Sequence, residues 1–168
     1  MKIRTGFVSN SSSSSFIVAT DVDLNTISLD EFRNMLGDFC LEVYCGWDSE
    51  TQEGKYEYPH ISVYAERIFK DLKEGSGVTE QTLIDEFKNQ YWDQVYNKYK
   101  KLERDTPIKD KWKKIENECV RLAKPAAKKY MDDNKFLYYT SYADENGEGH
   151  LEHQDIFRNF KYKRFSHH

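Results

Sequence analysis

The sequence has no long apolar run. Its basic start is not followed by the apolar segment that a secretory signal requires. None of its runs approaches the roughly 20 apolar residues that a helix needs to span a bilayer. We therefore expect a cytoplasmic protein with no membrane partner.

Cysteine is also scarce. Cys40, Cys45 and Cys119 make an odd number and lack the spacing of a zinc finger, so we expect reduced thiols. Cys45 and His60 carry no recognisable signature of a Cys–His nucleophile.

The net charge of −4 gives no overall attraction to nucleic acid. Residues 98–129 are rich in lysine, which we interpret as solvated helix faces, and nucleic acid is not an expected partner.

Aromatic side chains are what the sequence has in excess. They make up 15% of the 168 residues, with 12 Tyr and 10 Phe, while the hydrophobic fraction is only 38%. Because each aromatic ring buries a large area, these residues can supply a core that scarce aliphatic residues would not. The length predicts a single domain over residues 1–168.

Hydrophobic periodicity and capping signals predict alternating elements. Ser28 and Glu31 form a capping box for a short helix that Gly37 ends, and Thr79 and Thr106 are further caps. The expected strands are 16–20, 39–44, 136–142 and 161–167, and the expected helices are 29–36, 59–75, 79–105, 107–133 and 152–160, with a polar loop at 46–58 and a serine-rich lead segment at 1–15.

These elements predict an α+β fold. Strands from both chain ends would share one small mixed or antiparallel sheet, with residues 79–133 as a central antiparallel helical hairpin. The strand that follows the serines would pair with the last strand of the chain, so that Ser11–Ser15 pack beside the C-terminal segment.

The serine run lies within the stretch GFVSNSSSSSFIV. It lacks the glycines and the lysine of a phosphate-binding loop, so its local character is a polar lead into a strand. The stretch resembles the opening of small uncharacterised proteins of large tailed bacteriophages and some bacteria. The acidic turn that begins at Asp144, the segments that begin at Leu151 and Asp155, and the final Arg164–His168 resemble the C-terminus of the same group. The resemblance implies a phage accessory protein that acts inside an infected bacterium.

Our first hypothesis is a non-catalytic binding protein that inhibits or sequesters a host factor of defence or transcription, or holds a small ligand. It requires no cofactor. Aromatic residues in a polar loop are typical of binding hot spots. The candidate binding residues are Trp47, Tyr56, Tyr58, Ser11, Ser12, Ser13, Ser14 and Ser15.

The C-terminal quarter supports an alternative, a small metal-dependent hydrolase. Imidazole and carboxylate groups suit zinc, manganese or iron, and an open coordination position could activate water. The candidate ligands are His150, Glu152, His153, Asp155 and His167. The same region also matches the spacing of a calcium loop through Asp144, Asn146, Glu148 and Asp155. A virion or assembly component is the third hypothesis.

Overall fold

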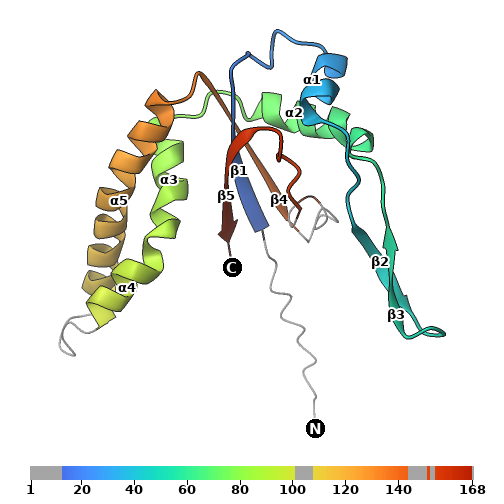
Figure 1. Ribbon diagram of the computed structural model, residues 1–168. Helices are drawn as coiled ribbons and strands as arrows, with labels where there is room; N and C mark the ends of the chain where they lie inside the picture. Colours follow the sequence, from blue (N-terminus) through green and yellow to red (C-terminus); the bar gives the residue numbers. More distant parts are fainter. Residues whose placement is uncertain (1–12, 101–107, 144–150, 152–153, 168) are drawn as a thin grey trace.

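The computed structural model describes residues 13–100, 108–143, 151 and 154–167. Its elements are β1 (Ser13–Thr20), α1 (Leu29–Leu36), β2 (Val43–Asp48), β3 (Glu53–Glu57), the 3₁₀ helix η1 (Ile61–Val63), α2 (Ala65–Glu74), α3 (Glu80–Gln90), α4 (Trp92–Lys100), α5 (Ile108–Asp132), β4 (Phe136–Ala143) and β5 (Lys161–His167). Figure 1 shows a central sheet with helices on both sides and a separate β-hairpin, which confirms the single-domain α+β fold.

The central sheet joins the two ends of the chain. Its order is β4-β1-β5, and both neighbours run antiparallel to β1. Ser13 lies opposite His167 and Ser15 lies opposite Phe165. The predicted pairing of the first and last strands is therefore confirmed. β1 begins at Ser13 because the serines already pair with both neighbouring strands, three residues before the predicted start.

The two faces of β1 serve two different hydrophobic cores. Phe16 and Val18 pack with residues of α1, α2 and the segment before β5. Ile17 lies on the other face, where it packs with residues of α3, α5 and Phe165 of β5. Every residue from Ser14 to Thr20 is buried, because β1 is covered on both faces and on both edges.

The helices α3, α4 and α5 form one arm of the molecule (Figure 1). Leu83 and Phe87 pack with Ala127 near the sheet, and Val95 packs with Ile115 at the far end. Residue numbers therefore rise along α3 and α4 in the direction in which they fall along α5, which confirms the antiparallel hairpin. The predicted continuous helix at 79–105 is broken at Tyr91, and its predicted last residues lie outside the described part of the chain.

The β2–β3 hairpin is the main correction to the predicted elements. Residues 46–58 were expected to be a loop, but Val43–Asp48 and Glu53–Glu57 pair as a two-stranded antiparallel sheet with a bulge near Gly46. The predicted strand at 39–44 begins as irregular chain, in which only Cys40 makes a bridge, to His60. β3 (EGKYE) is polar and largely exposed, so it lacks the apolar alternation that sequence reasoning requires, and without a recognisable partner strand the hairpin was not predicted.

The segment before β5 differs from the predicted helix at 152–160. Residues 154–160 form turns, in which Arg158 N–H donates to Asp155 O and Phe160 N–H donates to Phe157 O. Phe157 is fully buried against Phe16, at 5.4 Å between ring centroids. The apolar residues of this segment therefore reach the core from turns.

Candidate functional site

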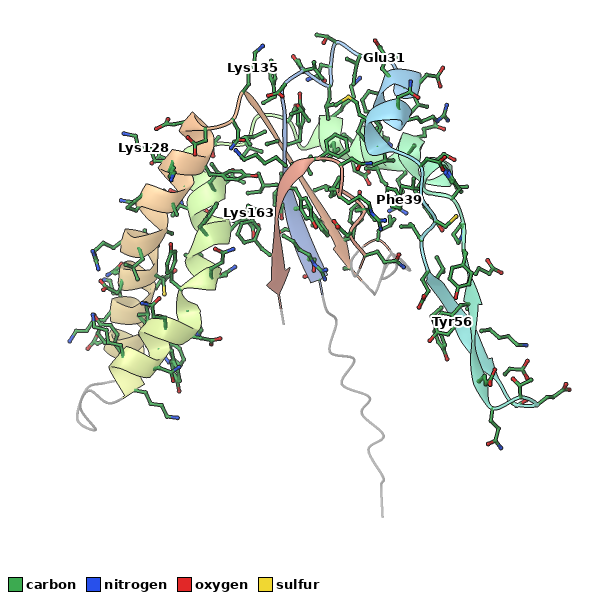
Figure 2. The ribbon with its side chains drawn as sticks, viewed as in Figure 1. Glu31, Phe39, Tyr56, Lys128, Lys135 and Lys163 are labelled. Carbon is green, nitrogen blue, oxygen red and sulfur yellow. The ribbon has the colours of Figure 1, made fainter. Side chains whose placement is uncertain are left out.

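The β2–β3 hairpin presents exposed tyrosines. Tyr44, Tyr56 and Tyr58 are 57%, 48% and 62% exposed. The rings of Tyr44 and Tyr56 lie on paired residues of the two strands and meet edge to face, with centroids 5.5 Å apart. Figure 2 shows Tyr56 on the hairpin as it projects away from the central sheet. This pair of rings gives the hairpin a preformed aromatic surface in solvent.

The turn of the hairpin is ordered by Asp48. Its Oδ1 accepts hydrogen bonds from Glu50 N–H at 2.9 Å and from Thr51 N–H at 3.4 Å, and Lys55 Nζ lies 3.1 Å from its Oδ2. The Glu50 N–H and the Lys55 ammonium hold the pKa of Asp48 below its ordinary value, because both stabilise the carboxylate. The anionic side chain thus acts as an Asx turn. Other carboxylates of the hairpin are exposed, namely Glu50, Glu53 and Glu57.

The base of the hairpin is tied to the body of the protein. Leu41 N–H donates to Pro59 O at 2.9 Å, and Ile61 N–H donates to Phe39 O at 2.8 Å. The side chains of Leu41 and Ile61 are fully buried. The Arg158 guanidinium lies 3.9 Å from the centroid of the Phe39 ring, a cation–π contact from the segment before β5. The tyrosines therefore project from an anchored base.

The same base brings together Asp38, His60 and Ser62. Ser62 Oγ lies 2.7 Å from His60 Nδ1, and Asp38 Oδ1 lies 2.5 Å from His60 Nε2. His60 is also the N-cap of η1, because its Nδ1 accepts the backbone N–H of Ser62 at 3.2 Å. A hydroxyl, an imidazole and a carboxylate in this order are the groups of an activated serine nucleophile.

Sequence reasoning missed this serine, histidine and aspartate set. It considered His60 only with Cys45. Asp38 is 22 residues from His60 in sequence, and the backbone pairing of residues 39–41 with 59–61 brings the two side chains together. A local signal exists only in His60–Ile61–Ser62, where a histidine precedes a serine by two residues at a helix start.

The predicted metal ligands lie almost wholly outside the described residues. This applies to His150, Glu152 and His153, to the side chain of His167, and to Asp144, Asn146 and Glu148 of the calcium alternative. Asp155 is described, and its Oδ1 accepts a hydrogen bond from Tyr162 Oη at 2.5 Å. Among the described residues, no group of three or more His, Cys, Asp or Glu side chains could hold a metal ion. The metal hypotheses stay predictions.

The described serines of the predicted binding set lie at the start of β1. Ser14 and Ser15 are fully buried. Ser15 Oγ donates to Glu86 Oε2 at 2.7 Å, and Arg164 Nε donates to Ser14 Oγ at 3.3 Å. These hydroxyls link the sheet to α3 and β1 to β5. Ser11, Ser12 and the side chain of Trp47 lie outside the described residues, and a binding role for the set stays a prediction.

A second aromatic surface lies on the helical arm. Trp92 of α4 and Trp112 of α5 stack with centroids 5.6 Å apart and planes 11° from parallel. Tyr96 lies on the same face of α4 and also stacks with Trp112, at 6.0 Å. Both tryptophans are partly exposed. This stack joins α4 to α5, so the exposed rings have a packing role in the arm itself.

Comparisons with known proteins give no relative. No family model, curated protein or solved structure matches the chain. Within the described residues, the structure has no helix long and apolar enough to cross a membrane.

Proposed function

We propose that the chain is a non-catalytic binding protein that engages a protein partner through the β2–β3 hairpin. The observation that supports this proposal is the exposure of Tyr44, Tyr56 and Tyr58 on one anchored, projecting element. Tyrosine is among the residues that contribute most to binding energy at protein interfaces. Exposing three on one small ribbon has a cost in water that a partner surface would remove.

The partner should combine an apolar surface with positive charge. The hairpin also exposes Glu50, Glu53 and Glu57, and Lys55 is paired with Asp48. Arginine or lysine side chains on the partner would pair with the glutamates and could also lie over the tyrosine rings. The contribution of the glutamates should fall as ionic strength rises, whereas burial of the rings should persist.

The resemblance of the chain ends to phage proteins supports a host partner. We therefore propose that the protein acts in the cytoplasm of an infected bacterium, where it would inhibit or sequester a factor of defence or transcription. No cofactor enters this proposal, because the contact depends on side chains of the hairpin alone.

Site-specific photo-crosslinking tests the hairpin as the contact surface. A benzophenone amino acid replaces Tyr56 in one sample and Trp112 in a matched sample, so that both carry a large aromatic probe on an exposed position. We expect irradiation in a lysate of the bacterial host to give a discrete crosslinked protein from position 56 and not from position 112. The same crosslink should weaken at least tenfold in the additional variant Tyr44→Ser. Identical products from both positions, or none from position 56, would contradict the proposal.

A further inference from the structure

We propose that Ser62 is a nucleophile that accepts acyl groups from esters, with His60 as its general base and Asp38 as the residue that positions the imidazole. This modification site is separate from the binding role proposed for the tyrosines. It rests on three contacts at the base of the hairpin, which join Ser62 Oγ and Ser62 N–H to His60 Nδ1 and Asp38 Oδ1 to His60 Nε2.

The backbone determines where the proton of His60 lies. The Ser62 N–H can only donate, and it points at His60 Nδ1 from 3.2 Å. Nδ1 must therefore carry a lone pair, and the neutral imidazole must carry its proton on Nε2. That Nε2–H donates to Asp38 Oδ1 at 2.5 Å, which holds this tautomer.

The same tautomer determines the direction of the remaining hydrogen bond. Since Nδ1 is an acceptor, the Ser62 hydroxyl donates to it across 2.7 Å and shares its lone pair with the longer contact from the Ser62 N–H. A hydroxyl that donates to a neutral imidazole is arranged to lose its proton as it attacks. The serine therefore has its base in place before any ester arrives.

The step conserves atoms and charge. Ser62 Oγ attacks the carbonyl carbon of an ester while its proton passes to His60 Nδ1, and the resulting imidazolium is stabilised by the Asp38 carboxylate. When the tetrahedral intermediate collapses, the ester C–O bond breaks and the alkoxide or phenoxide leaves with the proton from Nδ1. The products are an O-acyl serine and an alcohol or phenol, and His60 is again neutral.

The surroundings of Ser62 define which esters it can accept. The side chains of His60 and Asp38 are 37% and 96% exposed, so a small reagent reaches the site from solvent. The N–H groups of Ile61, Val63 and Tyr64 already donate to backbone carbonyls, and that of Ser62 donates to His60. This turn thus offers the oxyanion none of its four N–H groups, which favours esters with good leaving groups and a stable acyl serine.

The test uses p-nitrophenyl acetate on the full chain, followed by peptide mass spectrometry. Ser28 is the internal control, because its hydroxyl donates to the Glu31 carboxylate at 2.8 Å and has no imidazole partner. We expect acetylation of Ser62 to be on the order of 100-fold faster than that of Ser28, the range of general base catalysis.

Two variants separate chemistry from capping. His60→Asn places an amide oxygen near the position of Nδ1, so it can still cap the Ser62 N–H but cannot take up a proton. Acetylation of residue 62 should fall at least tenfold in this variant and disappear in Ser62→Ala, with thermal unfolding used to verify that both variants fold. Asp38→Asn should lower the rate less. Ser62 reacting no faster than Ser28, or equally fast in a folded His60→Asn protein, would overturn the proposal.

Discussion

Ser15 and Glu86 are 71 residues apart in sequence and are joined by a buried hydrogen bond of 2.7 Å from Oγ to Oε2. Ser15 lies on the central strand and Glu86 lies on α3, so this bond attaches the helical arm to the sheet through polar groups. Burial of the Tyr139 phenol raises its pKa. The nearby Glu86 carboxylate raises it further, because one negative charge disfavours the formation of another beside it. The serine run thus contributes to the interior of the fold.

Ser15→Ala should destabilise the protein by about 1.5–3 kcal/mol, the range for a buried hydrogen bond to a charged group. The substitution removes the donor and leaves Glu86 with fewer partners inside the protein. Chemical denaturation of the variant and the wild type measures the difference. Ser13→Ala is the matched control, because Ser13 is at the start of the same strand and is only partly buried. A loss as large in the control would contradict the specific role of the Ser15–Glu86 pair.

Position 75 requires glycine because its backbone lies too close to β4 for a side chain. Its carbonyl accepts the N–H of Tyr139 at 2.9 Å, and a Cβ at this position would lie 1.7 Å from the carbonyl oxygen of Tyr139. Gly75→Ala should therefore separate α2 from β4 and cost about 2–4 kcal/mol of unfolding free energy. Ser76→Ala changes an exposed neighbour and should cost less than about 0.5 kcal/mol. Equal denaturation midpoints for the two variants would show that the contact can relax.

The ion pairs of Glu118 with Arg121 and Lys98 predict how the stability of the helical arm changes in acid. Arg121 donates two hydrogen bonds to the Glu118 carboxylate, and Lys98 of α4 lies 3.4 Å away. The Arg121 hydrogen bonds and charge, with Lys98, lower the pKa of Glu118 from 4.5 to about 2. Because the pKa is lowered in the folded state, the stabilisation is complete above about 4.5 and is lost as pH falls toward 2.

The measurement is the difference in melting temperature between the wild type and Glu118→Gln across this acidic range. The wild type should be more stable near neutral pH, and the difference should shrink as the carboxylate is protonated. Glu116→Gln removes the same charge from an exposed position on the same helix. A difference for Glu118→Gln that stays constant down to the lowest pH would contradict the assigned ion pairs.

The sequence predicted those parts of the fold that depend on a few neighbouring residues or on recognisable terminal segments. The capping box of Ser28 and Glu31 is present, and Gly37 ends α1 with a φ of +95° that favours glycine. The pairing of β1 with β5 was predicted from the resemblance of the two chain ends together with strand patterns. These features depend on a few adjacent residues or on recognisable terminal blocks, so the sequence could reveal them.

Features that depend on exposed backbone or on distant partners could not be predicted in this way. The apolar spacing continues through Tyr91, so it did not reveal the turn that separates α3 from α4. β3 is largely exposed and shows no apolar alternation, so its pairing with β2 left no clear pattern in the sequence. His60 meets Asp38 only because the chain pairs at the base of the β2–β3 hairpin, which no local pattern encodes.

Two tyrosines with raised pKa values, Tyr130 and Tyr162, predict loss of stability in alkali. Burial raises the pKa of Tyr130 to about 12. Burial, together with a smaller effect of the hydrogen bond to Asp155, raises the pKa of Tyr162 to about 12. The fold therefore favours the neutral phenols, and this contribution is complete below the ordinary value of 10 and is lost as pH rises to about 12.

Tyr162→Phe separates the hydrogen bond from the titration. The variant should be less stable than the wild type near pH 8, because Asp155 loses the hydroxyl that donates to it. It should also lose less stability between pH 10 and about 12, since it has one fewer phenol whose pKa is raised to about 12 by folding. The two curves of unfolding free energy against pH are thus expected to converge in alkali. Denaturant titrations at each pH provide these curves, with phenolate absorbance recorded in parallel. Parallel curves would mean that Tyr162 ionises equally in the folded and unfolded states and would contradict the role given to its hydrogen bond with Asp155.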